Sequence, residues 1–159
     1  MAGFVVILMG SKADMEHAKT IADELGRLGI EVVMRIGSAH KTPEHVIELL
    51  RHYEADTRPK VYITIAGRSN ALSAFVDGQV SAPVIACPPY SDSFGGADVF
   101  SSLRMPAGIA PAVVLEPSGA ALLAARILGL GDPAIRERVE VLRQKNVDKI
   151  MGDDAALSD

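Results

Sequence analysis

The sequence predicts an α/β fold in which helices cover a five-stranded parallel sheet. Short apolar runs alternate with segments of helical periodicity along the whole chain, as a parallel sheet wrapped in helices requires. The first run, Phe4 to Met9, is apolar at every position, which is typical of a strand buried on both faces. With 159 residues, 48% of them apolar and 23% charged, the chain is expected to form one domain with one core.

Four further apolar runs predict the remaining strands, over residues 30–36, 61–66, 83–86 and 109–115. Pro111 has no N–H to donate to a neighbouring strand, so the start of the last strand is expected near the edge of the sheet.

Apolar stripes and capping residues predict the helices between these strands. A stripe from Ala18 to Leu28 predicts the first helix, and Gly29 ends it. Thr42-Pro43 fits an N-cap followed by proline at the first helical position, which opens a second helix. Two shorter helices are expected over residues 70–79 and 120–128.

A last helix, over residues 132–151, is predicted beyond the final strand, with Asp132-Pro133 at its start. The core is therefore expected over residues 4–130, and residues 152–159 are expected to form a frayed tail. Because no strand follows this extra C-terminal helix, we hypothesise that it covers a neighbouring subunit rather than its own sheet.

Charge and cysteine content exclude several classes of partner. Sixteen basic residues against twenty acidic ones give a net charge of −4, which argues against nucleic acid or an anionic membrane as partner. The first residues lack the basic leader of a signal peptide, and no apolar run approaches a membrane span, so a cytoplasmic location is expected. The single Cys87 forms no disulfide within the chain.

Three loops follow the first three strands, over residues 10–14, 37–41 and 67–70. The carboxyl ends of parallel strands share one edge of the sheet, and ligands of open α/β sheets bind beyond that edge. Glycine and serine allow the backbone to approach a ligand, and lysine or arginine neutralises an anion. The loops therefore predict a phosphate-bearing ligand, although each one also fits an ordinary tight turn capped by serine or aspartate.

Nucleotide and metal motifs are missing from the sequence. No Gly-x-Gly-x-x-Gly follows the first strand, and there is no Walker loop. No paired cysteines and no His-x-x-x-His spacing indicate a metal, and His17, His45 and His52 are expected to be solvated helix residues. The sequence thus predicts no cofactor and no metal.

His40 differs from the other histidines because it lies on a loop at the edge of the sheet, between Ser38 and Lys41. Histidine titrates close to neutral pH, and a neighbouring cation favours the neutral imidazole that can accept a proton. The position predicts a general base. The alternative is a histidine that only hydrogen-bonds within a turn.

Five motifs in this order resemble the PurE family of purine biosynthesis. They are Met9-Gly10-Ser11-Lys12-Ala13-Asp14, Ser38-Ala39-His40-Lys41-Thr42-Pro43, Ala66-Gly67-Arg68-Ser69-Asn70, Cys87-Pro88-Pro89 and Ser101-Ser102-Leu103-Arg104-Met105-Pro106. They are most similar to the class II branch, the aminoimidazole ribonucleotide (AIR) carboxylases.

The resemblance implies a single PurE-like domain over residues 1–159, with a flavodoxin-like three-layer sandwich. It also implies a homo-oligomer, usually an octamer, with active sites at subunit contacts. The reaction implied is the joining of AIR and carbon dioxide to give 4-carboxy-AIR, without metal or biotin.

Site residues carry over from the matching motifs. Ser11, Asp14 and the Ser38 loop would hold the ribose phosphate and sugar hydroxyls, and residues 67–70 would lie near the carboxyl group. His40 matches the catalytic histidine. The substrate-binding residues implied are Gly10, Ser11, Asp14, Ser38, Ala39, Lys41, Gly67, Arg68, Ser69, Asn70 and Arg104.

Three positions depart from the family pattern. Lys41 stands where many relatives have arginine, so it would contact phosphate as a point charge and not as a bidentate fork. Ala13 replaces a common serine and Ala71 a common glycine, and we expect both to affect affinity rather than chemistry.

Three alternatives remain open. The class I mutase moves a carboxyl group from the exocyclic nitrogen of carboxyamino-AIR, but its third loop contains a second histidine, which residues 67–70 lack. The related carboxylases of a pyridinium dinucleotide normally carry an additional domain. A non-catalytic phosphate-ligand binding module would need the loops but not the proton transfer.

Overall fold

Five parallel strands form one sheet in the order β2-β1-β3-β4-β5, in a computed structural model that describes residues 2–157. The strands are β1 (Phe4–Met9), β2 (Glu31–Ile36), β3 (Lys60–Ile65), β4 (Val84–Ala86) and β5 (Ala112–Val113). The chain moves from β1 outward to β2 and then returns to the other side of β1, so the strand order reverses between β1 and β3. The predicted α/β class and parallel sheet are confirmed.

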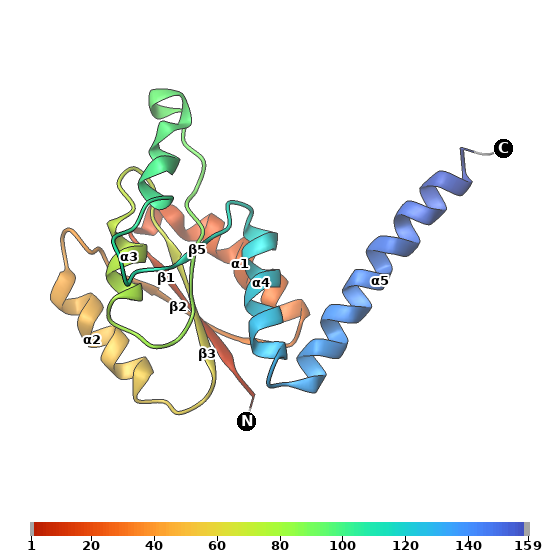
Figure 1. Cartoon of the computed structure of the whole chain (residues 1–159), viewed down its shortest axis with the longest axis horizontal. Helices are drawn as coiled ribbons and strands as arrows, with labels where there is room; N and C mark the ends of the chain where they lie inside the picture. Colours follow the sequence, from red (N-terminus) through yellow and green to blue (C-terminus); the bar gives the residue numbers. More distant parts are fainter. Residues whose placement is uncertain (1, 158–159) are drawn as a thin grey trace.

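Helices cover both faces of the sheet, which gives three layers (Figure 1). Helices α1 (Met15–Arg27) and α4 (Pro117–Gly129) lie on one face, and α2 (Pro43–Glu54) and α3 (Ala71–Asp77) lie on the other.

The position of strand β1 between two helical layers explains why its sequence is apolar throughout. Val5, Ile7 and Met9 pack into the core under α1 and α4, whereas Phe4, Val6 and Leu8 pack into a second core under α2 and α3. Because successive side chains of a strand point to opposite faces, a strand between two helical layers buries every residue.

The last strand is shorter than predicted. Only Ala112–Val113 pair with β4, although Val114 N still donates to Ala86 O at 2.9 Å. Pro111 cannot donate to the sheet, and Gly108, with a φ of 87°, lies in the turn just before it. The prediction of a strand over residues 109–115 was therefore wrong at both ends, and its place at the sheet edge is confirmed.

Two short 3-10 helices, η1 (Lys12–Asp14) and η2 (Ser93–Ser102), were not predicted. In η2, Phe94, Gly95 and Gly96 have positive φ values, so the segment is two turns joined by a break rather than one regular helix. A strand or helix period needs a longer regular stretch than this segment offers.

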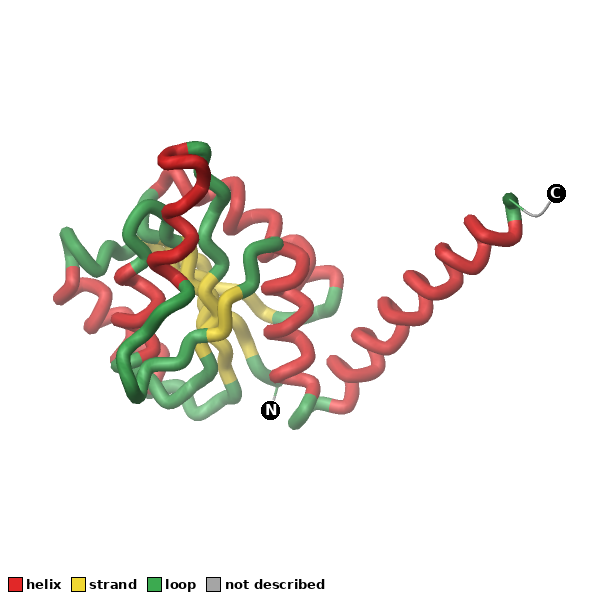
Figure 2. The backbone as a smooth tube through the Cα atoms, turned by 45° about the horizontal axis from the view of Figure 1, so that its top comes forward, coloured by secondary structure: helices red, strands yellow, loops and turns green. Residues whose placement is uncertain are grey.

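The C-terminal helix α5 (Pro133–Ala155) extends away from the sheet (Figures 1 and 2). The Asp132 side chain caps it by accepting from Ala134 N at 3.0 Å and from Ile135 N at 3.2 Å. We predicted a frayed tail from residue 152, but the helix continues to Ala155, so that prediction was wrong for residues 152–155. The end of the predicted tail, residues 158–159, lies outside the described residues. Across residues 2–157, no helix is long and apolar enough to cross a membrane.

Candidate active site

A cavity of about 700 Å³ lies where the loops after β1, β2 and β3 meet. Each loop begins at the carboxyl end of its strand, on either side of the point where the strand order reverses. All of the predicted site residues line this cavity except Asn70 and Arg104.

The loop after β1 is a capped turn as well as a cavity wall. Ser11 N donates to Asp14 Oδ2 at 3.0 Å, and Ala13 N donates to Ser11 Oγ at 3.2 Å. The Ser11 hydroxyl also donates to Asp14 Oδ2 at 3.2 Å, so these bonds leave Asp14 Oδ1 available to a ligand hydroxyl. The reciprocal bonds form a capping box that fixes both side chains at the start of η1 and α1.

The loop after β2 presents His40 at the cavity. Ser38 and Thr42 close the loop, since Ser38 N donates to Thr42 Oγ1 at 3.0 Å and Lys41 N donates to Ser38 Oγ at 3.2 Å. Helix α2 begins at Pro43 as predicted, but the Thr42 hydroxyl bonds back to Ser38 instead of capping the helix. His40 and Lys41 are exposed, and within residues 2–157 neither side chain has a hydrogen bond or ion pair to the protein. The imidazole is therefore open to a ligand.

The loop after β3 contains three residues that line the cavity and one that is buried beneath it. Gly67, Arg68 and Ser69 line the cavity, and Arg68 has a φ of 60°, which is uncommon outside glycine. Asn70 is only 3% exposed, and its side chain donates to Ser102 Oγ and accepts from Ser73 N. Asn70 thus supports the loop from beneath.

Arg104, the second predicted residue outside the cavity, is exposed in the segment that follows η2.

The segment after β4 supplies cavity residues that the sequence analysis did not assign. Pro89, Tyr90, Ser91 and Ser93 line the cavity, together with Leu72 from α3. The Tyr90 hydroxyl donates to Glu116 Oε1 at 2.5 Å, and this bond to a carboxylate raises the pKa of Tyr90. Strand β4 ends at the same edge of the sheet as β1 and β3. The Cys87-Pro88-Pro89 motif directly follows β4, so its position could have predicted that this segment lines the cavity.

His17 is half-buried and is not the solvated helix residue that we predicted. Its Nε2 lies 3.3 Å from the Sγ of Cys87, and burial lowers the pKa of the imidazole. His45 and His52 on α2 are exposed as predicted. In the part of the chain that the structure describes, no three histidine, cysteine or acidic side chains are grouped to hold a metal ion.

Cys87 is expected to react slowly with alkylating reagents in the folded protein. Burial raises the pKa of its thiol to about 12, and only the thiolate is nucleophilic. At pH 8, iodoacetamide should label the native thiol roughly a thousandfold more slowly than the thiol of the unfolded chain. Mass spectrometry of a labelling time course, with and without guanidinium chloride, measures the ratio, and equal rates would show that the thiol is accessible and ionised.

Comparisons with known proteins agree on one family. Residues 4–149 match the family model described as AIR carboxylase. The phosphoribosylaminoimidazole carboxylase of Treponema denticola is 62% identical over 157 residues, which are 99% of this chain and 99% of that protein. The crystal structure of Treponema denticola PurE superposes with a TM-score of 0.97 at 61% identity and covers 99% of both chains.

More distant relatives show the same match. The phosphoribosylaminoimidazole carboxylase of Archaeoglobus fulgidus is 58% identical over 84% of this chain and 73% of its own length. A bifunctional carboxylase and succinocarboxamide synthetase of Mus musculus is 43% identical over 80% of this chain, but the match spans only 30% of that longer protein. On the strength of the family model and the full-length relative, the chain belongs to the AIR carboxylase family.

Proposed function

We propose that this protein is an AIR carboxylase of purine biosynthesis, which reversibly joins carbon dioxide to the imidazole carbon of AIR with His40 as general acid and base. The observation that carries the proposal is the cavity itself. It combines an imidazole that has no partner among residues 2–157 with loop hydroxyls and the cationic residues Lys41 and Arg68. A phosphorylated substrate that must lose a proton needs this combination.

Substrate binding is assigned to the first two loops. In this proposal, Lys41 neutralises the phosphate, and Asp14 Oδ1 accepts a hydrogen bond from a ribose hydroxyl. The capping box holds the Asp14 carboxylate in place before the substrate arrives, and the bonds between Ser38 and Thr42 hold the backbone that carries Lys41, so little backbone ordering is needed on binding.

The chemistry starts from the substrate's own reactivity. AIR is an electron-rich enamine, so its ring carbon forms the new bond to carbon dioxide while one C=O electron pair moves to oxygen. No covalent help is needed, and the enzyme contributes mainly by holding the reactants together. The ring carbon is then tetrahedral, because it carries both its original hydrogen and the new carboxylate. His40 removes that hydrogen as a proton, which restores aromaticity, and returns it in the reverse reaction.

The loop of residues 67–69 is assigned to the carboxyl group. Negative charge grows on the oxygens of carbon dioxide during attack, and N–H groups and a cation near those oxygens stabilise it. Arg68 and Ser69 line the cavity on the side of β3. No histidine stands at residues 67–70, which favours direct carboxylation over transfer from carboxyamino-AIR.

An assay with AIR, bicarbonate and no ATP tests the proposal, with 4-carboxy-AIR followed by its absorbance. Steady formation of 4-carboxy-AIR is the expected result. Turnover from carboxyamino-AIR alone would assign the mutase activity instead, and no turnover of either substrate would leave only a binding function.

We place the reaction in the cytoplasm, since its substrates are small metabolites and the only cysteine is free.

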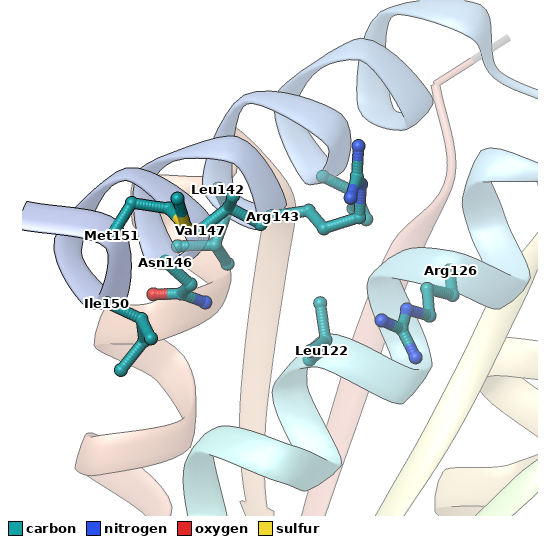
Figure 3. Close-up of a pocket in the computed structure, with 9 residues that line it drawn as sticks. Leu122, Arg126, Leu142, Arg143, Asn146, Val147, Ile150 and Met151 are labelled. Atoms are coloured by element: carbon teal, nitrogen blue, oxygen red, sulfur yellow. The ribbon is translucent and has the colours of Figure 1, made fainter. Parts of the chain in front are cut away.

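We also propose that the protein is a homo-oligomer, in the form of an octamer. Helix α5 and helix α4 enclose an apolar groove of about 390 Å³ (Figure 3), which contains the side chains of Leu122, Leu142, Val147, Ile150 and Met151. Ile150 is 65% exposed and Met151 63% exposed, although both are large apolar residues. Contact with a second copy of the chain would remove this surface from water.

Replacing Ile150 by glutamate is expected to shift the protein to a smaller assembly, because the new charge would be buried at the contact between copies. The mass measured by light scattering after size exclusion checks this. Val141→Glu is the matched control, since Val141 is also on α5 and 49% exposed but does not line the groove. An unchanged mass for Ile150→Glu would place the contact elsewhere.

A further inference from the structure

Arg68 has a backbone conformation that arginine rarely adopts. Its φ of 60° lies in the left-handed region, which is unfavourable for residues that carry a Cβ. Such a residue persists when the surrounding structure determines its conformation, and such residues gather at functional sites.

Four buried polar side chains form one hydrogen-bonded chain beneath this loop. Thr64 Oγ1 lies 2.7 Å from Ser73 Oγ, and Ser73 Oγ donates to Asn70 Oδ1 at 2.8 Å. Asn70 Nδ2 then donates to Ser102 Oγ at 2.9 Å. In the described residues these four are the only buried serine, threonine and asparagine side chains, and none of their polar atoms lacks a partner. These hydrogen bonds therefore join β3, α3 and η2 into one rigid support.

Ser101 connects this support to Arg68. Its hydroxyl accepts from Asn70 N at 3.0 Å and lies 3.3 Å from the carbonyl oxygen of Arg68 and 2.8 Å from that of Asp98. One exposed hydroxyl thus contacts the backbone on both sides of Ser69, at the point where the positive φ turns the chain.

We infer that Ser101 is a positioning residue that holds Arg68 at the cavity in its strained conformation, supported by the buried chain from Thr64 to Ser102. The inference rests on the proposed function, because the benefit lies in presenting the Arg68 charge to the developing carboxylate. It gives a role to the segment of residues 101–102, which does not itself line the cavity.

A double-mutant cycle with kcat as the readout tests this. Arg68→Ala is expected to lower kcat about a hundredfold, as loss of a group that stabilises transition-state charge does. Ser101→Ala is expected to lower kcat about tenfold, with the KM for AIR unchanged because the phosphate and ribose contacts lie on other loops. In the Arg68→Ala background, Ser101→Ala should cost less than about twofold further, since the group it positions is gone.

Two controls separate positioning from loss of structure. Ser101→Thr keeps the hydroxyl and should restore kcat to within about twofold of wild type. Ser118→Ala, at an exposed serine in the first turn of α4, should leave kcat unchanged. Equal losses from Ser101→Ala in both backgrounds, or no loss in either, would overturn the inference. A wild-type protein that does not turn over AIR would instead refute the proposed function.

Discussion

Replacing His40 by asparagine is expected to lower kcat for AIR carboxylation by about two to four orders of magnitude, the usual effect of losing a general acid–base group. Asparagine keeps a similar polar shape but cannot take a proton from the ring carbon. The imidazole has no partner among the described residues, so its loss should leave the fold unchanged. Steady-state assays with AIR and bicarbonate measure the effect.

Binding separates this account from a non-catalytic phosphate-ligand module. Calorimetry with AIR should give nearly the same Kd for His40→Asn as for wild type, because the phosphate and sugar contacts are assigned to other residues. His45→Asn is the matched control, since His45 is exposed on α2 and does not line the cavity, and its kcat should not change. Full activity of His40→Asn would contradict the role of His40.

Gly37→Ala should destabilise the protein by about 1–3 kcal/mol, the usual cost of overpacking a filled site. A Cβ at Gly37 would lie 2.8 Å from Cγ2 of Val46, which is fully buried in α2. Gly37 N also donates to Met9 O at 2.9 Å, so the backbone has little freedom to move away. Urea denaturation at fixed protein concentration measures the change, and activity should fall as well, because Gly37 immediately precedes the loop that carries His40.

Replacing Gly26 by alanine should instead increase the stability of the protein. Gly26 lies in α1, and a Cβ there meets no atom within 4 Å, so alanine should stabilise the helix by about 0.5–1 kcal/mol. If Gly37→Ala were as stable as Gly26→Ala, the close packing of the His40 loop against α2 would be wrong.

The sequence was sufficient to predict the fold because the strand and helix signals are strong and agree. The continuous apolar run of β1 required two covered faces, and residues such as Gly29, Pro43 and Asp132 marked helix ends correctly. The last strand and η2 were less predictable, because both are short and are determined by turn geometry rather than by a period.

The position of the candidate site was also predictable, since the carboxyl ends of parallel strands must share an edge. What the sequence did not contain was the direction of each side chain. Asn70 belongs to a loop that lines the cavity, yet packing against Ser102 and Ser73 turns it inward. The positive φ of Arg68 was equally hidden, because no glycine marks it.

A crystal structure of the wild-type protein with AIR bound tests whether His40 faces the reacting carbon of the substrate. We predict that the substrate occupies the cavity of the first three loops, with its phosphate at Lys41 and its nucleophilic ring carbon within about 3–3.5 Å of the His40 imidazole. A ring carbon facing away from His40, or AIR bound outside this cavity, would contradict the mechanism.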